Sequence, residues 1–330
     1  MKYSEWLGEW LETCAKPNVT PRTFESYKAI VRLHIAPKIG RFPLTELTAS
    51  VLQKFIAEMS ANYAANTVSC IIAVIRGSLF RAEKTGVVEK QYAECIQRPR
   101  IREKKVECFT PTEQKKLEKY IFERLERHKL FGIIITLYTG LRIGELLALE
   151  WTDIDFKRAR LTVTKTARDI WKGGYKKVIS DPKTKNSARV IPFARQLVPY
   201  LRTLKKLSKS KYVISEGDGR DVPIRSYQRT FELLLKRLKM PHRGFHSLRH
   251  TFATRAIECG VDVKTLSEIL GHKDSSITLN RYAHSLMEHK ILMMNRLGKS
   301  LYAEAPLPAA NKFDSVAIIP STSVNAVPLA

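Results

Sequence analysis

Apolar residues recur three and four positions apart through the first hundred residues, which is the spacing of one face of an α-helix. Thr20 stands where it can cap the second of these helices, Pro37 is expected to end it, and Gly86 is expected to end the last. Trp6 and Trp10 lie on the apolar face of the first helix and are predicted to be core. The four predicted helices cover residues 3–14, 20–37, 48–59 and about 66–86.

The pattern changes after residue 110, where Thr110, Pro111 and Glu113 form a capping box with proline at the first helical position. Helical spacing then covers residues 117–121, 130–138, 226–239, 247–259 and 263–270. Three runs alternate like strands, at residues 160–164, 177–180 and 189–192, and Gly173-Gly174 is expected to turn the chain between the first two. These patterns predict a mainly α fold: an N-terminal helical domain, then an α-helical domain with a small three-stranded antiparallel sheet.

A basic, proline-containing stretch separates the two parts of the chain. We expect a helical domain at 1–97, a basic linker at 98–109, a second domain at 110–300 and a flexible tail, rich in Ser, Val, Ala and Pro, at 301–330. A linker that lies on DNA is favoured over a merely solvated charge run. The candidate DNA-binding residues of the linker are Arg98, Arg100, Arg102, Lys104 and Lys105.

The charge balance points to the partner. With 57 basic and 32 acidic residues the formal charge is +25, which favours nucleic acid over the alternatives of a ribosome-associated protein or a membrane-surface binder. No apolar run approaches the roughly 20 residues of a membrane span, and the N-terminus lacks a secretory apolar segment. The five cysteines form no C-x-x-C pair, so neither a zinc ribbon nor a disulfide framework is expected. A cytoplasmic protein, nucleoid-associated when bound to DNA, is predicted.

Five side chains make a set suited to attack on a phosphodiester: Arg142, His246, Arg249, His272 and Tyr282. A guanidinium is always charged and can donate two hydrogen bonds to one phosphate. A phenol is an oxygen nucleophile once it loses its proton, and imidazole can accept or donate that proton. The histidines show no H-E-x-x-H or similar ligand spacing, so no metal site and no cofactor are expected.

Two other interpretations of the same residues are open. Residues 265–282 have the outline of a helix-turn-helix, which is typical of a repressor, but a repressor leaves His246, Arg249 and Arg142 unexplained. An arginine in the first turn of a helix is more often a surface residue. For Arg142, the flanking Gly140 and Gly144 would let the backbone approach a ligand closely.

Three motifs in this order and spacing resemble the tyrosine site-specific recombinases, the phage and transposon integrase group with its DNA breaking-rejoining fold. They are Thr-Gly-Leu-Arg-Ile-Gly-Glu-Leu at 139–146, His-Ser-Leu-Arg-His at 246–250, and Leu-Gly-His at 270–272 followed by Arg-Tyr at 281–282. The resemblance extends from residue 1 to about 298. The N-terminal part is similar to the helical core-binding domain of that family.

The resemblance implies a role for each candidate. Tyr282 would attack the scissile phosphate and form a 3′-phosphotyrosine, while Arg142 and Arg249 clamp the transition state. His246 would be the general acid/base and His272 would donate a hydrogen bond to the phosphate. The family also uses a lysine of the sheet as general acid toward the 5′-oxygen. Lys183 is the best match in the hairpin at 182–192, with Lys185 as the second candidate.

The resemblance also implies the partners: double-stranded DNA carrying core recombination sites, a homotetramer on two duplexes, and an accessory directionality factor. Neither metal nor ATP is expected, because the phosphotyrosine retains the bond energy. The chain begins almost directly with the core-binding helices, so recombination without an arm-binding domain, or a truncated chain, is expected. The alternatives are a relaxing type IB topoisomerase and a DNA-binding regulator with an inactive recombinase-like domain.

Overall fold

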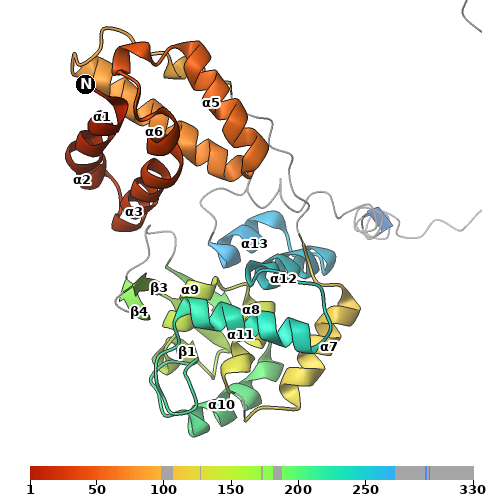
Figure 1. Cartoon of the computed structure of the whole chain (residues 1–330). Coiled ribbons are helices and arrows are strands. Elements are labelled where there is room, and N and C mark those ends of the chain that lie inside the picture. Colours follow the sequence, from red (N-terminus) through yellow and green to blue (C-terminus); the bar gives the residue numbers. More distant parts are fainter. Residues whose placement is uncertain are drawn as a thin grey trace, which may run out of the picture. The chain divides into compact units, whose positions relative to one another are not determined.

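The computed structural model describes residues 1–97, 107–126, 128–171, 174–180 and 188–271, together with residues 294, 295 and 297. The chain divides into two compact units, Met1–Lys105 and Val106–Ala330 (Figure 1). Most of the predicted linker and all of the predicted tail lie outside the described residues. Each unit has its own hydrophobic core.

Unit 1 is a helical bundle built around its longest helix. Its elements are α1 (Tyr3–Trp10), α2 (Lys16–Asn18), α3 (Pro21–Ile30), α4 (Ala36–Ile39), α5 (Ala49–Asn62) and α6 (Ala65–Lys84), with π turns at Leu11–Ala15 and Val31–Ile35 and 3-10 turns at Leu44–Glu46 and Ala93–Cys95. Helix α6 contacts α1, α3 and α5. Trp6 and Trp10 are buried as predicted, and the Trp6 indole donates a hydrogen bond of 2.9 Å to the Ser78 carbonyl. The apolar face of the first helix is therefore core.

The ends of these helices follow the predicted caps with one exception. The Thr20 hydroxyl accepts a hydrogen bond from the Thr23 backbone, and Gly86 follows α6 with a φ of 75°. Pro37 does not end its helix, because the chain stays helical to Ile39. A proline ring collides with the carbonyl four residues back in a regular α-helix. The wider π turn at Val31–Ile35 immediately precedes this point and shifts the hydrogen-bond register there.

Unit 2 contains seven α-helices and five strands among its described residues. The helices are α7 (Pro111–Phe122), α8 (Phe131–Thr139), α9 (Ile143–Ala148), α10 (Val198–Leu207), α11 (Ile224–Arg237), α12 (His246–Glu258) and α13 (Val263–Leu270). The strands are β1 (Ile154–Asp155), β2 (Arg160–Val163), β3 (Thr166–Trp171), β4 (Tyr175–Ser180) and β5 (Arg189–Pro192). The capping box at Thr110 and Glu113 is present, so the predicted start of α7 is confirmed.

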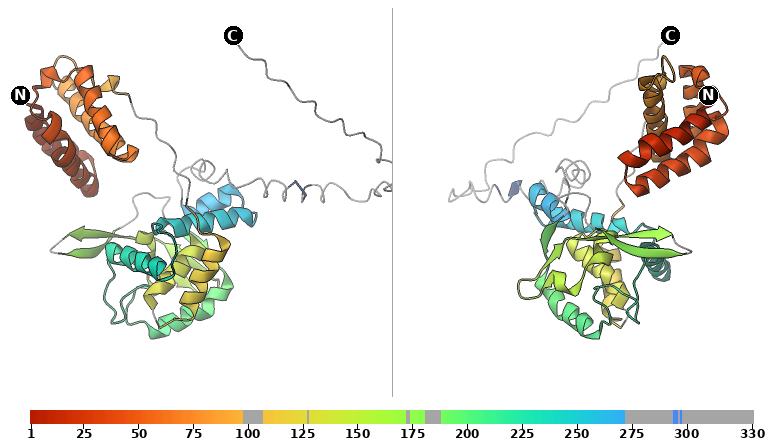
Figure 2. Two further views of the ribbon diagram at one scale, coloured as in Figure 1. Left: turned by 45° about the vertical axis from the view of Figure 1, so that its right-hand side comes forward. Right: turned by 90° about the vertical axis from the view of Figure 1, so that its left-hand side faces the viewer.

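The strands form two antiparallel sheets rather than the single sheet expected. One has the order β1-β2-β5, and the other is the hairpin β3-β4, which projects from the body of unit 2 (Figure 2). The hairpin partner of β4 is therefore β3 and not β2, and Gly173 of the predicted turn lies outside the described residues. The segment that follows β2 is too long to be part of a tight turn. It forms the additional strand β3, in which Thr166 pairs with Ser180 of β4.

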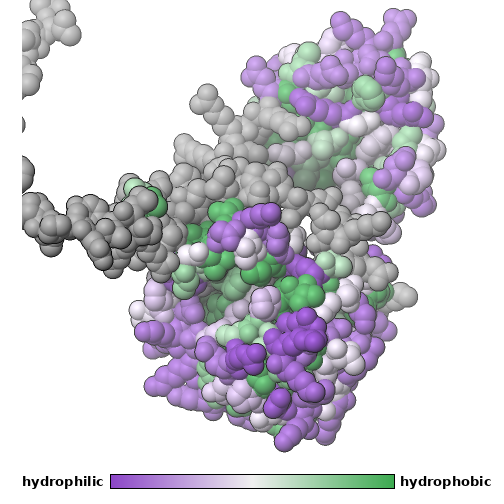
Figure 3. Space-filling view, turned by 180° about the vertical axis from the view of Figure 1, so that it is seen from behind, coloured by the Kyte–Doolittle hydropathy of each residue, from purple (hydrophilic) through white to green (hydrophobic). Residues whose placement is uncertain are grey.

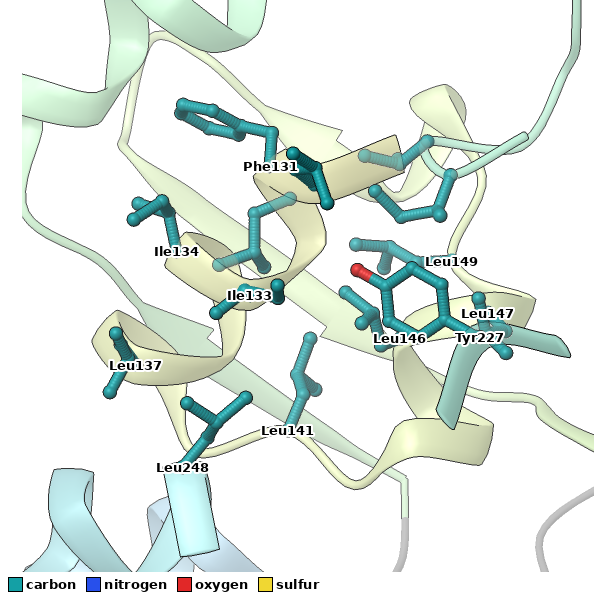
Figure 4. Packing of buried hydrophobic residues seen from close by; sticks show 14 of the residues in the cluster. Phe131, Ile133, Ile134, Leu137, Leu141, Leu146, Leu147, Leu149, Tyr227 and Leu248 are labelled. Atoms are coloured by element: carbon teal, nitrogen blue, oxygen red, sulfur yellow. The ribbon is translucent and has the colours of Figure 1, made fainter. Parts of the chain in front are cut away.

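Helix α8 lies in the middle of the unit 2 core. Figure 4 shows Leu137, Leu141 and Leu248 gathered at its C-terminal end, while Tyr227 faces Leu146. Leu248 belongs to α12, and its side chain is fully buried. This packing fixes the first turn of α12 against the end of α8, which is where the functional side chains are found.

The hairpin also caps a helix. Helix α11 follows Pro223, which has no side chain able to cap it, and the Asp169 carboxylate of β3 accepts hydrogen bonds from the backbone of Ile224 (2.8 Å) and Arg225 (2.9 Å). Asp169→Ala should therefore lower the free energy of unfolding by about 1 kcal/mol, measured by urea unfolding. Asp218→Ala is the control, because the Asp218 carboxylate accepts a hydrogen bond only two residues along the chain, from the Arg220 backbone. This substitution should lower the free energy of unfolding by less. Equal losses would contradict the capping role.

Over the described ranges, every helix is too short or too polar to cross a bilayer. Figure 3 shows mainly hydrophilic side chains on the visible face, with apolar ones in small groups.

Candidate active site

Arg249 is a fully buried cation beside the core. It follows Leu248 in α12 and is 1% exposed. Its Nη1 donates to the Gly140 carbonyl at 2.8 Å, and its Nη2 donates to the Leu270 carbonyl at 2.6 Å. A buried charge is tolerated only where polar groups replace its hydration. The guanidinium thus ties the end of α8 to the end of α13.

Arg142 reaches the same place from the N-terminus of α9. Its Nη1 donates to Glu145 Oε1 at 2.9 Å and to the Leu270 carbonyl at 3.3 Å, and its Nη2 donates to the Gly271 carbonyl at 3.2 Å. The side chain is 38% exposed. Because Arg142 and Arg249 share one carbonyl oxygen, their guanidinium groups are neighbours. The structure brings these two predicted residues together although they are far apart in the sequence.

The two glycines beside Arg142 are required by the packing of the chain. Gly140 ends α8 with a φ of 68°, and a Cβ there would lie 2.5 Å from the ring of Phe252. A Cβ on Gly144 would lie 2.6 Å from Thr166 Oγ1 and 2.7 Å from the Ala167 carbonyl. Helix α9 therefore needs glycine in order to lie against β3.

A second arginine–carboxylate pair supports Arg142. The Glu145 carboxylate, 6% exposed, receives two hydrogen bonds from Arg189 of β5: Nη1 to Oε1 at 3.0 Å and Nη2 to Oε2 at 2.8 Å. Arg189 Nε also donates to the Ile269 carbonyl at 2.6 Å. Sequence reasoning did not identify Arg189, since an arginine in a short alternating run is typical of any exposed strand position.

Arginines bind three carbonyls at the C-terminal end of α13. The last carbonyls of a helix lack partners within the helix and carry partial negative charge. Here the Ile269 carbonyl accepts from Arg189, the Leu270 carbonyl from Arg142 and Arg249, and the Gly271 carbonyl from Arg142. We call Arg142, Arg189, Arg249 and Glu145 the arginine cluster. Three cations against one carboxylate leave it positively charged, which suits a phosphate.

Glu145 stays ionised far below neutral pH. Burial raises the pKa of this carboxyl, but the hydrogen bonds and charge of Arg189, and then the charge of Arg142, outweigh burial and leave the pKa at about 2. A carboxyl whose pKa is depressed in the folded state stabilises the fold above its unfolded pKa, and this contribution is lost as the pH falls toward the folded pKa. The stabilisation by Glu145 is therefore lost over the pH range from 4.5, the ordinary pKa, down to about 2.

A pH dependence of stability follows from this depressed pKa. Glu145→Gln should lower the thermal unfolding midpoint clearly at pH 7, and the difference from wild type should shrink steadily below about pH 4.5. Calorimetry of both proteins across this range measures it. Glu232→Gln, at an exposed carboxylate of α11, is the control and should show no such trend. A difference that is constant down to pH 3 would contradict the assignment.

His246 is the first residue of α12 and is exposed, one turn before Arg249. Residues three apart lie on the same side of a helix. The His246 ring contacts His250 edge to face, with centroids 4.6 Å apart. The remaining sequence-predicted residues lie outside the described part of the chain: Lys183, Lys185, His272, Tyr282 and the linker residues Arg98, Arg100, Arg102, Lys104 and Lys105.

The search for metal sites covers the same part of the chain. Among the residues that the structure describes, no group of three or more His, Cys, Asp or Glu side chains is placed to hold a metal ion.

Comparison with known proteins identifies the family. Residues 107–289 match the model of the phage integrase family, and residues 2–60 match the N-terminal SAM-like domain of phage integrases. The chain belongs to the phage integrase family, the group of tyrosine recombinases that the sequence motifs resemble. The predicted family and the mainly helical fold are confirmed.

Several relatives are similar over much of the chain. A XerC-like tyrosine recombinase of Caldanaerobacter subterraneus subsp. tengcongensis is 35% identical over 210 residues, which cover 57% of this chain and 53% of that protein. The chain thus spans about half the length of this relative. The transposase of transposon Tn916 from Enterococcus faecalis is 26% identical over 314 residues, 89% of this chain and 77% of that protein.

Solved structures share the fold. The integrase of transposon Tn1549, in complex with transposon right end DNA, superposes with a TM-score of 0.76 at 22% identity, covering 90% of this chain and all of that one. A λ integrase dimer bound to a COC′ core site gives a TM-score of 0.66 at 16% identity, over 86% of this chain and 77% of that one. At such identities the likeness concerns the fold alone.

Proposed function

We propose that the chain is a site-specific tyrosine recombinase that cleaves and rejoins DNA to integrate or excise a mobile element. One observation carries the proposal. Arg142 and Arg249 share the Leu270 carbonyl within a positively charged cluster, and His246 lies one turn from Arg249. A pair of neighbouring guanidiniums with an imidazole beside it suits a phosphate that becomes more negative in the transition state.

The proposed reaction exchanges one phosphoester bond for another. The Tyr282 oxygen attacks the scissile phosphorus, a P–O bond to tyrosine forms, and the bond to the 5′-oxygen breaks. The phenol proton passes to His246 acting as base, and the leaving 5′-oxygen receives a proton from Lys183 or Lys185. Arg142 and Arg249 hold the non-bridging oxygens, and His272 donates a further hydrogen bond. Attack by the 5′-hydroxyl of a partner strand reverses these steps.

Independence of metal and ATP belongs to this proposal. The charge that develops on the phosphate is balanced by two guanidiniums, which stay ionised at any working pH. The phosphotyrosine keeps the phosphoester bond, so rejoining needs no further source of energy. No cofactor is then required.

The proposed partner is double-stranded DNA with core recombination sites. Related structures contain the Tn1549 integrase with circular-intermediate DNA and a λ integrase tetramer on a Holliday junction. We extend this to four protomers on two duplexes, aided by an accessory directionality factor. The charge of +25 supports DNA binding. We assign residues 1–97 to core-site binding, 110–300 to catalysis and phosphate contacts to the linker residues Arg98, Arg100, Arg102, Lys104 and Lys105.

Covalent capture on nicked duplexes from the ends of the host element tests the proposal. With EDTA present, wild-type protein should form an adduct that survives a denaturing gel. A clear gel shift without an adduct would instead favour a DNA-binding regulator. A second assay separates the recombinase from a topoisomerase. A recombinase should act only when two recombination sites are present, whereas a topoisomerase should relax a plasmid that carries no such site.

A further inference from the structure

We propose that Arg189 is a positioning residue that sets the direction of the Arg142 and Arg249 guanidiniums without touching DNA itself. This inference rests on the proposed function and deepens it. Arg189 is 7% exposed, and its side chain links β5, where it stands, to α9 through Glu145 and to α13 through Ile269. An outer residue of this kind can orient the groups that bind the substrate.

The first link runs through Glu145. Arg189 binds both carboxylate oxygens and so fixes the plane of the carboxylate. Glu145 Oε1 then accepts from Arg142 Nη1 at 2.9 Å, and Oε2 accepts from the Arg142 backbone N–H, also at 2.9 Å. With the carboxylate plane fixed, the Arg142 fork has one favourable direction. Without Arg189, the carboxylate could rotate and carry Arg142 with it.

The second link runs through the end of α13. Arg189 Nε holds the Ile269 carbonyl, and the next carbonyl, that of Leu270, receives Arg249 and Arg142. A Cβ on Gly271 would lie 3.0 to 3.2 Å from the Arg189 guanidinium, so this turn rests directly on it. A shift of Arg189 would therefore move the acceptor that both phosphate-binding arginines share.

The backbone of Arg189 provides the fixed point for these links. It pairs with Val163 at the start of β5, in the three-stranded sheet. Side chains that start from a sheet are placed more reproducibly than those from a loop. The side chain then spans from the sheet to the helix end, where a shorter residue would remove one donor from each Glu145 carboxylate oxygen and the Nε donor from the Ile269 carbonyl.

Arg189→Met tests the inference, with Lys129→Met as matched control. Lys129 forms a partly buried ion pair with Glu216 at 2.6 Å, at the opposite end of α8 from Gly140. We expect Arg189→Met to slow single-turnover cleavage of a nicked duplex about 100-fold, the loss typical of a small misplacement of reacting groups. DNA affinity should stay within about twofold, because no phosphate contact is lost. The control should cleave at the wild-type rate.

A double-mutant cycle separates positioning from mere stabilisation. Because one of its two links runs through Arg142, Arg189→Met combined with Arg142→Lys should cleave clearly faster than the product of the two single losses predicts. Losses that multiply fully, with no coupling between the two positions, would contradict the link through Arg142 and overturn the inference. Arg189→Lys should restore part of the rate, since it keeps a charge beside Glu145 but cannot bind both oxygens and the carbonyl.

A spectroscopic measurement keeps this inference distinct from the proposed function. The Nε–H signals of isotopically labelled Arg142 and Arg249, assigned with single Lys variants, should both shift in Arg189→Met and stay in place in Lys129→Met. Unshifted signals would overturn the inference whatever the activity. If wild-type protein forms no adduct but the signals shift, the proposed function fails while the positioning of the two guanidiniums stands.

Discussion

Tyr282→Phe is expected to abolish the covalent protein–DNA adduct completely while DNA affinity stays within about twofold of wild type. The phenol oxygen is the proposed nucleophile, and phenylalanine has no atom that can form the new bond to phosphorus. Binding depends on many phosphate contacts, among which one hydroxyl contributes little. The loss should therefore appear in chemistry alone.

A denaturing gel after incubation with a nicked duplex measures the adduct, and a native gel shift measures affinity. Tyr120→Phe is the matched control, because it also removes one phenol hydroxyl from unit 2. This hydroxyl belongs to α7 and accepts a hydrogen bond from Arg237. It should form adduct normally. An adduct retained by Tyr282→Phe, or a large loss of binding, would exclude Tyr282 as the nucleophile.

The second large effect is expected for Arg142→Lys, which should slow cleavage by roughly 100- to 1,000-fold. Arg142 uses both Nη atoms at once, on Glu145 and on two carbonyls, and a single ammonium cannot reproduce that fork. The side chain is 38% exposed, so the fold should lose little stability. Loss of rate without loss of structure is the expected signature.

Single-turnover cleavage and thermal unfolding, compared in the same preparation, measure this prediction. Arg220→Lys is the control, at an arginine whose side chain is 80% exposed and paired with its neighbour Asp218. It should behave as wild type in both measurements. Near-normal cleavage by Arg142→Lys would remove the clamp role from Arg142.

Much of the fold could be predicted because local patterns determine it. The α7 capping box, the apolar faces of the unit 1 helices and the residues of α13 follow from spacing and cap chemistry. Arg142 and Arg249 could be identified from motifs, and the structure places them together. Their detailed roles, with those of His246 and Tyr282, stay predictions.

The rest depends on contacts between distant segments. Strand β3 exists because β4 pairs with it, and its own sequence alternates poorly. Pro37 stays helical because of a neighbouring π turn that no propensity predicts. The pairing of Arg189 with Glu145 joins residues 44 positions apart, so no local pattern could reveal it. The packing role of Gly144 could not be predicted, because the sequence does not show that β3 lies against it.

The carbonyls at the end of α13 have a consequence for how this family can diverge. Every amino acid offers the same main-chain oxygen, so these carbonyl acceptors impose no side-chain identity at positions 269 and 270. Only packing restrains those two positions, and Gly271 is restrained by its φ of 63°. The carbonyl acceptors of the site can therefore remain while the residue types at positions 269 and 270 change. Substitutions at positions 269 and 270 that pack equally well should therefore leave the hydrogen bonds to the three arginines in place.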